Sequence, residues 1–191
     1  VYKRQGSWGV YWLPQRYLEN GGLTGGWGTI SQMMIGILLL TPISLWRKFK
    51  GRSSGLEIPF VGFLTGSGFI CYALSFLLTD VVRALIMFYM IPVWTTIFEI
   101  IFLKKRPGLE RVLTLGLALG GLWIVFSKSN IVPLPQNAGD WLALVGGVLF
   151  GGGLIRLEIT KTDGVFPVIF SFFFYGTCLL YTSDAADDLI G

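Results

Sequence analysis

The sequence lacks histidine and is poor in charged residues. None of its 191 residues is His, and Asp, Glu, Lys and Arg together make up only 14%. The lack of imidazole argues against His-based catalysis, His metal sites and His proton relays. Two widely separated cysteines provide no metal or disulfide framework. We therefore expect no cofactor, no bound metal and no catalytic residue.

The low charge also argues against a soluble domain. Soluble globular domains carry roughly 25% charged residues, whereas this chain is 53% hydrophobic with a mean hydropathy of +0.66. A helix needs about 20 mostly apolar residues to cross a membrane. The apolar runs predict an all-α, polytopic transmembrane bundle. After a short, truncated first helix at 6–18, the expected spans are 27–46, 58–78, 82–103, 109–126 and 141–157, with a seventh beginning near 165.

Basic residues cluster on alternate loops between these runs. They follow the spans ending near 46, 103 and 157, and few basic residues lie on the opposite side. The positive-inside rule places the clustered loops in the cytoplasm. This pattern explains the net charge of +4 without nucleic acid as a partner. We expect a multi-pass protein of the cell membrane, which is the inner membrane in a Gram-negative cell.

The two ends of the chain share an unusual relationship. One short DNA sequence, read on opposite strands, encodes both Val1–Gln5 and the run from Cys178 to Thr182. It resembles a transposon-based sequencing adaptor, and Ser183 to Asp188 looks like its continuation. We therefore expect 1–5 and 178–191 to be adaptor-derived and not to pack as part of the fold. The native stretch, 6–177, is expected to be a fragment of a longer protein.

Small residues predict where helices approach closely. GxxxG pairs occur at Gly62 and Gly66, at Gly116 and Gly120, and at Gly147 and Gly151. Such pairs allow close backbone contact between helices in lipid. The run at 151–153 lacks the Lys-Ser/Thr of a phosphate-binding loop, so we expect it to serve helix packing.

Four stretches resemble the EamA-type transporters of the drug/metabolite transporter superfamily. They are GSWGVYW at 6–12, ALIMFYMIPVWTTIFEIIFLKKRP at 84–107, LGLALGG at 115–121 and GDWLAL at 139–144. Lys105 departs from the pattern, because the family often has Glu there. No single motif is diagnostic; the order and spacing carry the resemblance.

The resemblance implies a fold of ten spans in two inverted repeats, with the substrate site near the midplane between them. It divides the chain into a first repeat at 6–126, a loop at 127–140 and the start of a second repeat at 141–177. The implied function is that of a secondary transporter, a permease or exporter, which moves small organic metabolites, such as amino-acid-like solutes, by alternating access. Two alternatives stay open: a non-transporting sensor or assembly subunit, and a membrane enzyme acting on lipid. The expected partners are the lipid bilayer, a small-molecule substrate and the missing C-terminal half, with a second copy of the chain as an open alternative.

The span at 82–103 is the most informative for a site. Helical spacing places one polar set on a single face, which we expect to point into the bundle: Leu85, Tyr89, Pro92, Thr96 and Glu99. The opposite, apolar face is expected to contact lipid: Ile86, Met90, Val93, Ile97 and Ile101. The proline removes one backbone donor and frees the carbonyl of Phe88. Two interpretations of Glu99 stay open: a protonatable coupling group, or an ion pair with Lys104, Lys105 or a neighbouring helix.

Other candidates for the substrate pathway are spread over the remaining helices. Tyr11, Trp12 and Gln15 lie on the first segment, where Trp12 also fits an aromatic belt at the interface. Gln32 and Tyr72 are polar positions within the second and third spans. Arg83 lies at the start of the fourth span. Two roles stay open for it: its side chain extends to the membrane surface as an anchor, or it attracts an anionic substrate.

Overall fold

The computed structural model describes residues 26–49, 57–129, 134–160 and 165–190, together with positions 17, 21 and 55. Its helices follow the predicted apolar runs closely. They are α3 (Gly26–Phe49), α4 (Glu57–Leu78), α5 (Val81–Phe88), α6 (Ile91–Phe98), a π-helical segment η1 (Glu99–Leu103), α7 (Leu109–Ser129), α8 (Ala138–Ile159) and α9 (Val165–Ile190). The described chain contains helices and connecting loops, as predicted for an all-α bundle. The predicted loop at 127–140 is shorter than expected, because α7 extends to Ser129 and α8 begins at Ala138.

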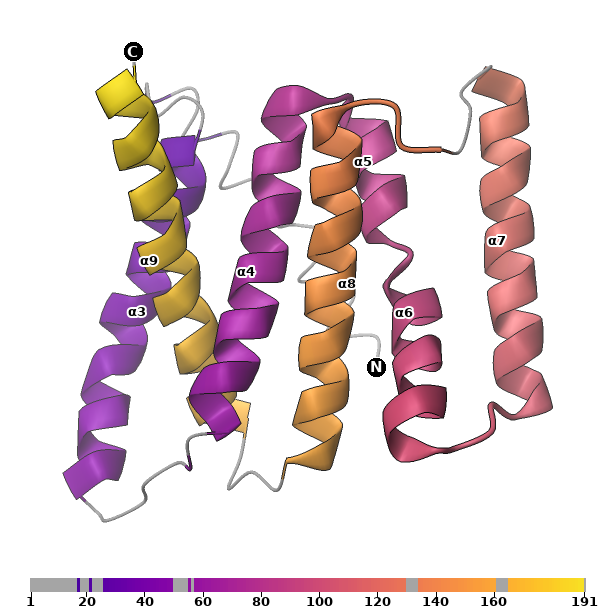
Figure 1. Ribbon diagram of the computed structural model, residues 1–191. Helices are drawn as coiled ribbons and strands as arrows, with labels where there is room; N and C mark the ends of the chain where they lie inside the picture. Colours follow the sequence, from indigo (N-terminus) through magenta and orange to yellow (C-terminus); the bar gives the residue numbers. More distant parts are fainter. Residues whose placement is uncertain are drawn as a thin grey trace.

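Five helical stretches are long and apolar enough to cross a membrane: Gly28–Arg47, Glu57–Phe76, Val81–Leu103, Ala138–Ile159 and Val165–Thr182. They run up and down side by side (Figure 1). α7 coincides with the fifth predicted span, and its crossing of the membrane stays a prediction. The protein is therefore a multi-pass helical membrane protein.

The helix bundle is organised around α4 and α8. These two helices pack most closely, α9 packs between α4 and α3, and α5 and α6 cover another side of α8. One apolar core joins α3, α4 and α9 through Ile30, Met33, Ile70 and Leu180. α7 stands at the edge of the row, beyond α6 (Figure 1).

The core reaches into the segment that was expected not to pack. α9 continues through Cys178, and Leu180 is only 1% exposed against Ile30 and Met33. The expectation that residues from 178 onward stay outside the fold is therefore wrong for Leu180. The DNA origin of these residues does not determine whether an apolar side chain at position 180 packs against its neighbours.

Two of the three predicted glycine contacts are confirmed. A Cβ on Gly62 would collide with Ser171 of α9, and one on Gly147 would lie 3.0 Å from the carbonyl oxygen of Phe88. The third prediction is wrong, because nothing lies within 4 Å of a Cβ built on Gly116 or Gly120. The difference follows from the place of α7 at the edge of the bundle.

The predicted span at 82–103 is not one continuous helix. α5 ends at Phe88, and α6 begins at Ile91 with Pro92 in its first turn, where a missing N–H costs little. The freed Phe88 carbonyl faces Gly147 of α8. The prediction of a break at this proline is thus confirmed. The interruption also changes which side chains share a face, and this alters the site.

Candidate functional site

The membrane acid Glu99 forms an ion pair with an arginine from another helix. Glu99 begins the π-helical segment, and its side chain is 13% exposed. Its carboxylate pairs with Arg111 in the first turns of α7. The guanidinium Nε of Arg111 also donates to the hydroxyl oxygen of Thr96 at 3.1 Å. That hydroxyl in turn donates to the Pro92 carbonyl at 2.7 Å.

This arrangement brings together three of the predicted site residues. Pro92, Thr96 and Glu99 are connected through Arg111, which was not among the predicted site residues. Single π-helical turns occur often at functional sites, because the wider turn redirects a side chain. Of the two interpretations of Glu99, the structure shows the contact that the second one requires, an ion pair with a neighbouring helix, and the partner is Arg111. A coupling role for this pair stays a prediction.

The continuous inward face predicted for this span is wrong in its first half. Tyr89 is 65% exposed and Pro92 is exposed, whereas Ile86, expected to contact lipid, is only 9% exposed. In the second half the prediction holds, because Thr96 is buried while Ile101 is 60% exposed. The break at 89–90 rotates α5 relative to α6, so regular helical spacing cannot be carried across it.

The other candidates are not brought to the same place. Tyr72 of α4 stacks on Phe88, with ring centroids 4.1 Å apart. Gln32 of α3 has a buried Nε2 with no hydrogen-bond partner within the described ranges, and Thr177 of α9 has such an Oγ1. Tyr11, Trp12 and Gln15 lie outside the described residues.

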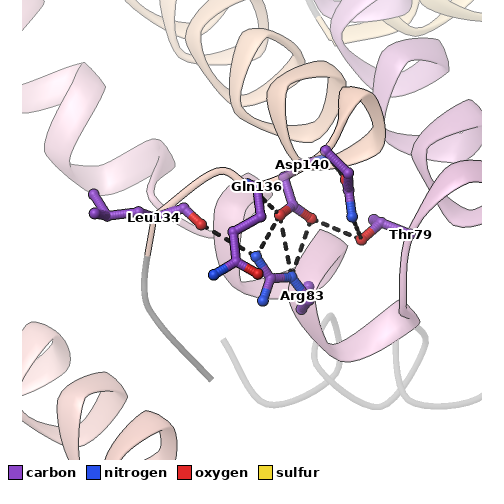
Figure 2. A network of polar contacts seen from close by, with 6 residues as sticks. Thr79, Arg83, Leu134, Gln136 and Asp140 are labelled. Carbon is purple, nitrogen blue, oxygen red and sulfur yellow. Dashed lines mark hydrogen bonds and ion pairs between the residues drawn. The ribbon is translucent and has the colours of Figure 1, made fainter. Parts of the chain in front are cut away.

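Arg83 has a different role from either that the sequence suggested. Its side chain is 9% exposed and pairs with Asp140 of α8, whose side chain is fully buried. Arg83 Nη2 lies 2.5 Å and Nε 3.1 Å from Oδ2 of Asp140, and Nη2 also donates to the Leu134 carbonyl at 3.1 Å. Figure 2 shows the guanidinium held between these acceptors. Arg83 is therefore neither an anchor that extends to the membrane surface nor an unpaired cation that attracts an anion.

The Asp140 carboxylate is surrounded by further donors (Figure 2). Thr79 Oγ1 donates to Oδ1 at 2.7 Å, and the Gln136 backbone N–H donates to Oδ2 at 3.0 Å. Asn137 caps α8 by accepting from the Asp140 N–H, and its amide donates to Thr79 Oγ1 at 3.0 Å. Sequence reasoning missed Asp140 because it placed this residue in a loop. The available signal was an Asn followed three residues later by an acid, a common helix start.

The other end of α8 carries two exposed ion pairs. Arg156 lies 2.5 Å from Glu57 at the start of α4, and Lys105 lies 2.8 Å from Glu158. The hydrogen bond to Glu158 raises the pKa of the Lys105 ammonium above its ordinary value. All four side chains are at least 41% exposed, so water and salt screen these pairs. The two ends of α8 are thus fixed by contacts of very different strength.

The fold defines a polytopic α-helical membrane protein. Within it, Glu99 at the end of the broken span pairs with Arg111 of α7. Residues 6–127 match the sequence model of the EamA-like transporter family. Because the match covers more than half of the chain, the protein belongs to this family and is a membrane transporter. No curated protein and no solved structure gave a match.

Proposed function

We propose that the protein is a secondary transporter that moves small organic solutes, with amino-acid-like compounds as the substrate class, by alternating access. The family and the five membrane-crossing stretches support the transport class. The charge pattern supports basic loops in the cytoplasm. The second repeat begins with α8, and the remaining helices of the full protein complete the substrate pathway.

The pair of Glu99 and Arg111 is the observation that supports a coupling site. An acid at the centre of a membrane helix costs about 2.5–3.5 kcal/mol, and acids within membrane helices commonly mark ion or proton pathways. Glu99 lies near the end of the span Val81–Leu103, so its cost is lower. The Glu99 side chain is 13% exposed, whereas that of Arg111 is 41% exposed. A proton that binds Glu99 removes its charge and breaks the pair, and the released guanidinium has access to water.

This step connects the protonation of Glu99 to a helix movement. Arg111 belongs to α7, which makes few other close contacts in the described chain. While Glu99 is ionised, the pair holds α7 to the end of α6. When Glu99 is neutral, the hydrogen bond from Arg111 Nε to the Thr96 hydroxyl remains, and α7 is held less firmly. The proposed coupling therefore uses a proton to loosen one helix while solute crosses.

The test compares Glu99→Gln with Glu110→Gln in the full-length protein. Both changes remove one acid near Arg111, but Glu110 is exposed on α7. Uptake of a radiolabelled amino-acid mixture is measured across a pH series, together with exchange in the absence of a proton gradient. We expect Glu99→Gln to lose gradient-driven accumulation and to keep exchange, while Glu110→Gln behaves as the wild type.

An unchanged pH profile in Glu99→Gln would show that the ion pair is purely structural. Loss of both accumulation and exchange, with the protein still folded, would place Glu99 in solute binding and not in coupling. The two results are separated by the exchange assay, because exchange needs the solute site and does not need net proton movement.

A further inference from the structure

The helix α8 lies beyond the matched family unit and yet is embedded in it. The match ends at residue 127, and α8 begins at Ala138. By sequence, α8 therefore starts the second repeat. In the bundle it lies against α4, α5 and α6 of the first repeat (Figure 1).

One line of glycines on α8 faces α4 along its length. Gly139, Gly146 and Gly153 occur at intervals of seven residues, a spacing that keeps one helix face toward its neighbour. A Cβ at Gly139 would lie 2.9 Å from the Leu78 backbone, and one at Gly146 would lie 2.7 Å from a backbone oxygen of Gly68. One at Gly153 would approach Thr65 to 2.6 Å. The two backbones are close enough that one helix cannot slide along the other without collision.

A second line of glycines on α8 faces the broken span. Gly147 lies against the Phe88 carbonyl of α5, and a Cβ at Gly151 would lie 3.3 Å from Trp94 of α6. Ala143 is fully buried and packs in one cluster with Ala84 and Met87 of α5. The small residues of α8 thus allow it to pack closely against the broken span on both sides of the break.

The buried ion pair fixes the Asp140 end of this unit. To move α8 away from the turn between α4 and α5, Arg83 must leave Asp140, whose side chain is fully buried. Separating a buried pair leaves an uncompensated charge in a medium of low dielectric, which is strongly unfavourable. The exposed pairs at the other end do not oppose movement to the same degree.

We propose that α4, α5, α6 and α8 move as one rigid body during transport, locked by the Arg83–Asp140 pair and the glycine contacts. The boundary between moving parts then does not coincide with the boundary between the repeats. This inference rests on the proposed alternating-access function. It means that α8 moves with helices of the first repeat, although by sequence it begins the second.

The first test joins α8 to α4 covalently. Thr79 Oγ1 and Asn137 Nδ2 are 3.0 Å apart, so Thr79→Cys and Asn137→Cys place two thiols in contact range. The full-length protein, with its other cysteines replaced, is oxidised in vesicles, and uptake of a radiolabelled amino-acid mixture is measured before and after reduction. The single-cysteine variants serve as controls for the oxidant.

If the four helices move together, the cross-linked protein keeps its uptake to within about twofold of the reduced form. A loss of about tenfold or more that reduction restores would overturn the proposal, because it would show that α8 must separate from α4. If neither the wild type nor the reduced variant takes up the mixture, the transport proposal fails instead.

A second measurement decides the question without transport. Spin labels at Phe60 on α4 and Leu154 on α8 occupy exposed positions, at 51% and 38% exposure. We expect one distance distribution that is unchanged between acidic and neutral pH and on addition of the amino-acid mixture. A distribution that shifts or splits under these conditions would overturn the rigid unit.

Discussion

Replacing Arg83 by Met tests the buried network most directly. Met keeps an unbranched apolar stem but removes both nitrogens that donate to Asp140, at 2.5 and 3.1 Å. The carboxylate keeps only the donors from Thr79 and Gln136, and the Leu134 carbonyl loses its donor. Because the Asp140 side chain is fully buried, the loss of Arg83 leaves its charge without the cation that it pairs with. Breaking a buried pair in this way costs about 3–5 kcal/mol.

The measurement is the free energy of unfolding of the full-length protein in mixed detergent micelles, for the wild type and a double-mutant cycle. Arg83→Met and Asp140→Leu are studied singly and together. We expect each single change to destabilise strongly and the double change to cost clearly less than the sum, since no charge is then left unpaired. A coupling energy of roughly 0.5–3 kcal/mol is typical of residues in contact. If Arg83→Met costs under about 1 kcal/mol, or if the two costs simply add, the pair does not lock α8.

Gly146→Ala is expected to destabilise the protein by about 1–3 kcal/mol, because the added Cβ would meet the backbone of α4. Gly116→Ala, where nothing lies near the added Cβ, is expected to be neutral or slightly stabilising. Equal effects of the two changes on unfolding in detergent would contradict the packing. Single cysteines at Ser53 and Asn137 are expected to react with an impermeant reagent from outside only at Asn137, and the reverse pattern would invert the topology. Glu57→Gln is expected to change stability by under about 1 kcal/mol, because its ion pair is exposed, and a larger loss would show that this end is also locked.

The helices could be predicted from the sequence because the bilayer imposes length and hydrophobicity on each one. The predicted 58–78 and the observed Glu57–Leu78 differ by one residue. A break near Pro92 was also predictable, since proline chemistry is local. The rotation that this break produces between α5 and α6 was not, and it moved Tyr89 off the predicted face.

The partners of the charged residues could be predicted less well. Arg83 and Asp140 are 57 residues apart in the chain, and no periodicity connects them. For Glu99, helical spacing indicated a buried acid but did not identify its partner. Arg111 lies on the next helix, and the path of the loop between η1 and α7 brings it to Glu99. Glycine pairs predicted contacts in α4 and α8 but also in α7, since the motif shows that a helix can pack closely and does not show that a neighbour is present.

The central claim is that the full-length protein uses a proton gradient to move a small organic solute. The most direct test is uptake of a radiolabelled amino-acid mixture into proteoliposomes under an inward-directed and, separately, an outward-directed proton gradient, since symport uses the first and antiport the second. We expect accumulation above the equilibrium level that a protonophore abolishes and that Glu99→Gln does not support. Uptake no greater than in protein-free vesicles, from protein that is folded and inserted, would contradict the claim.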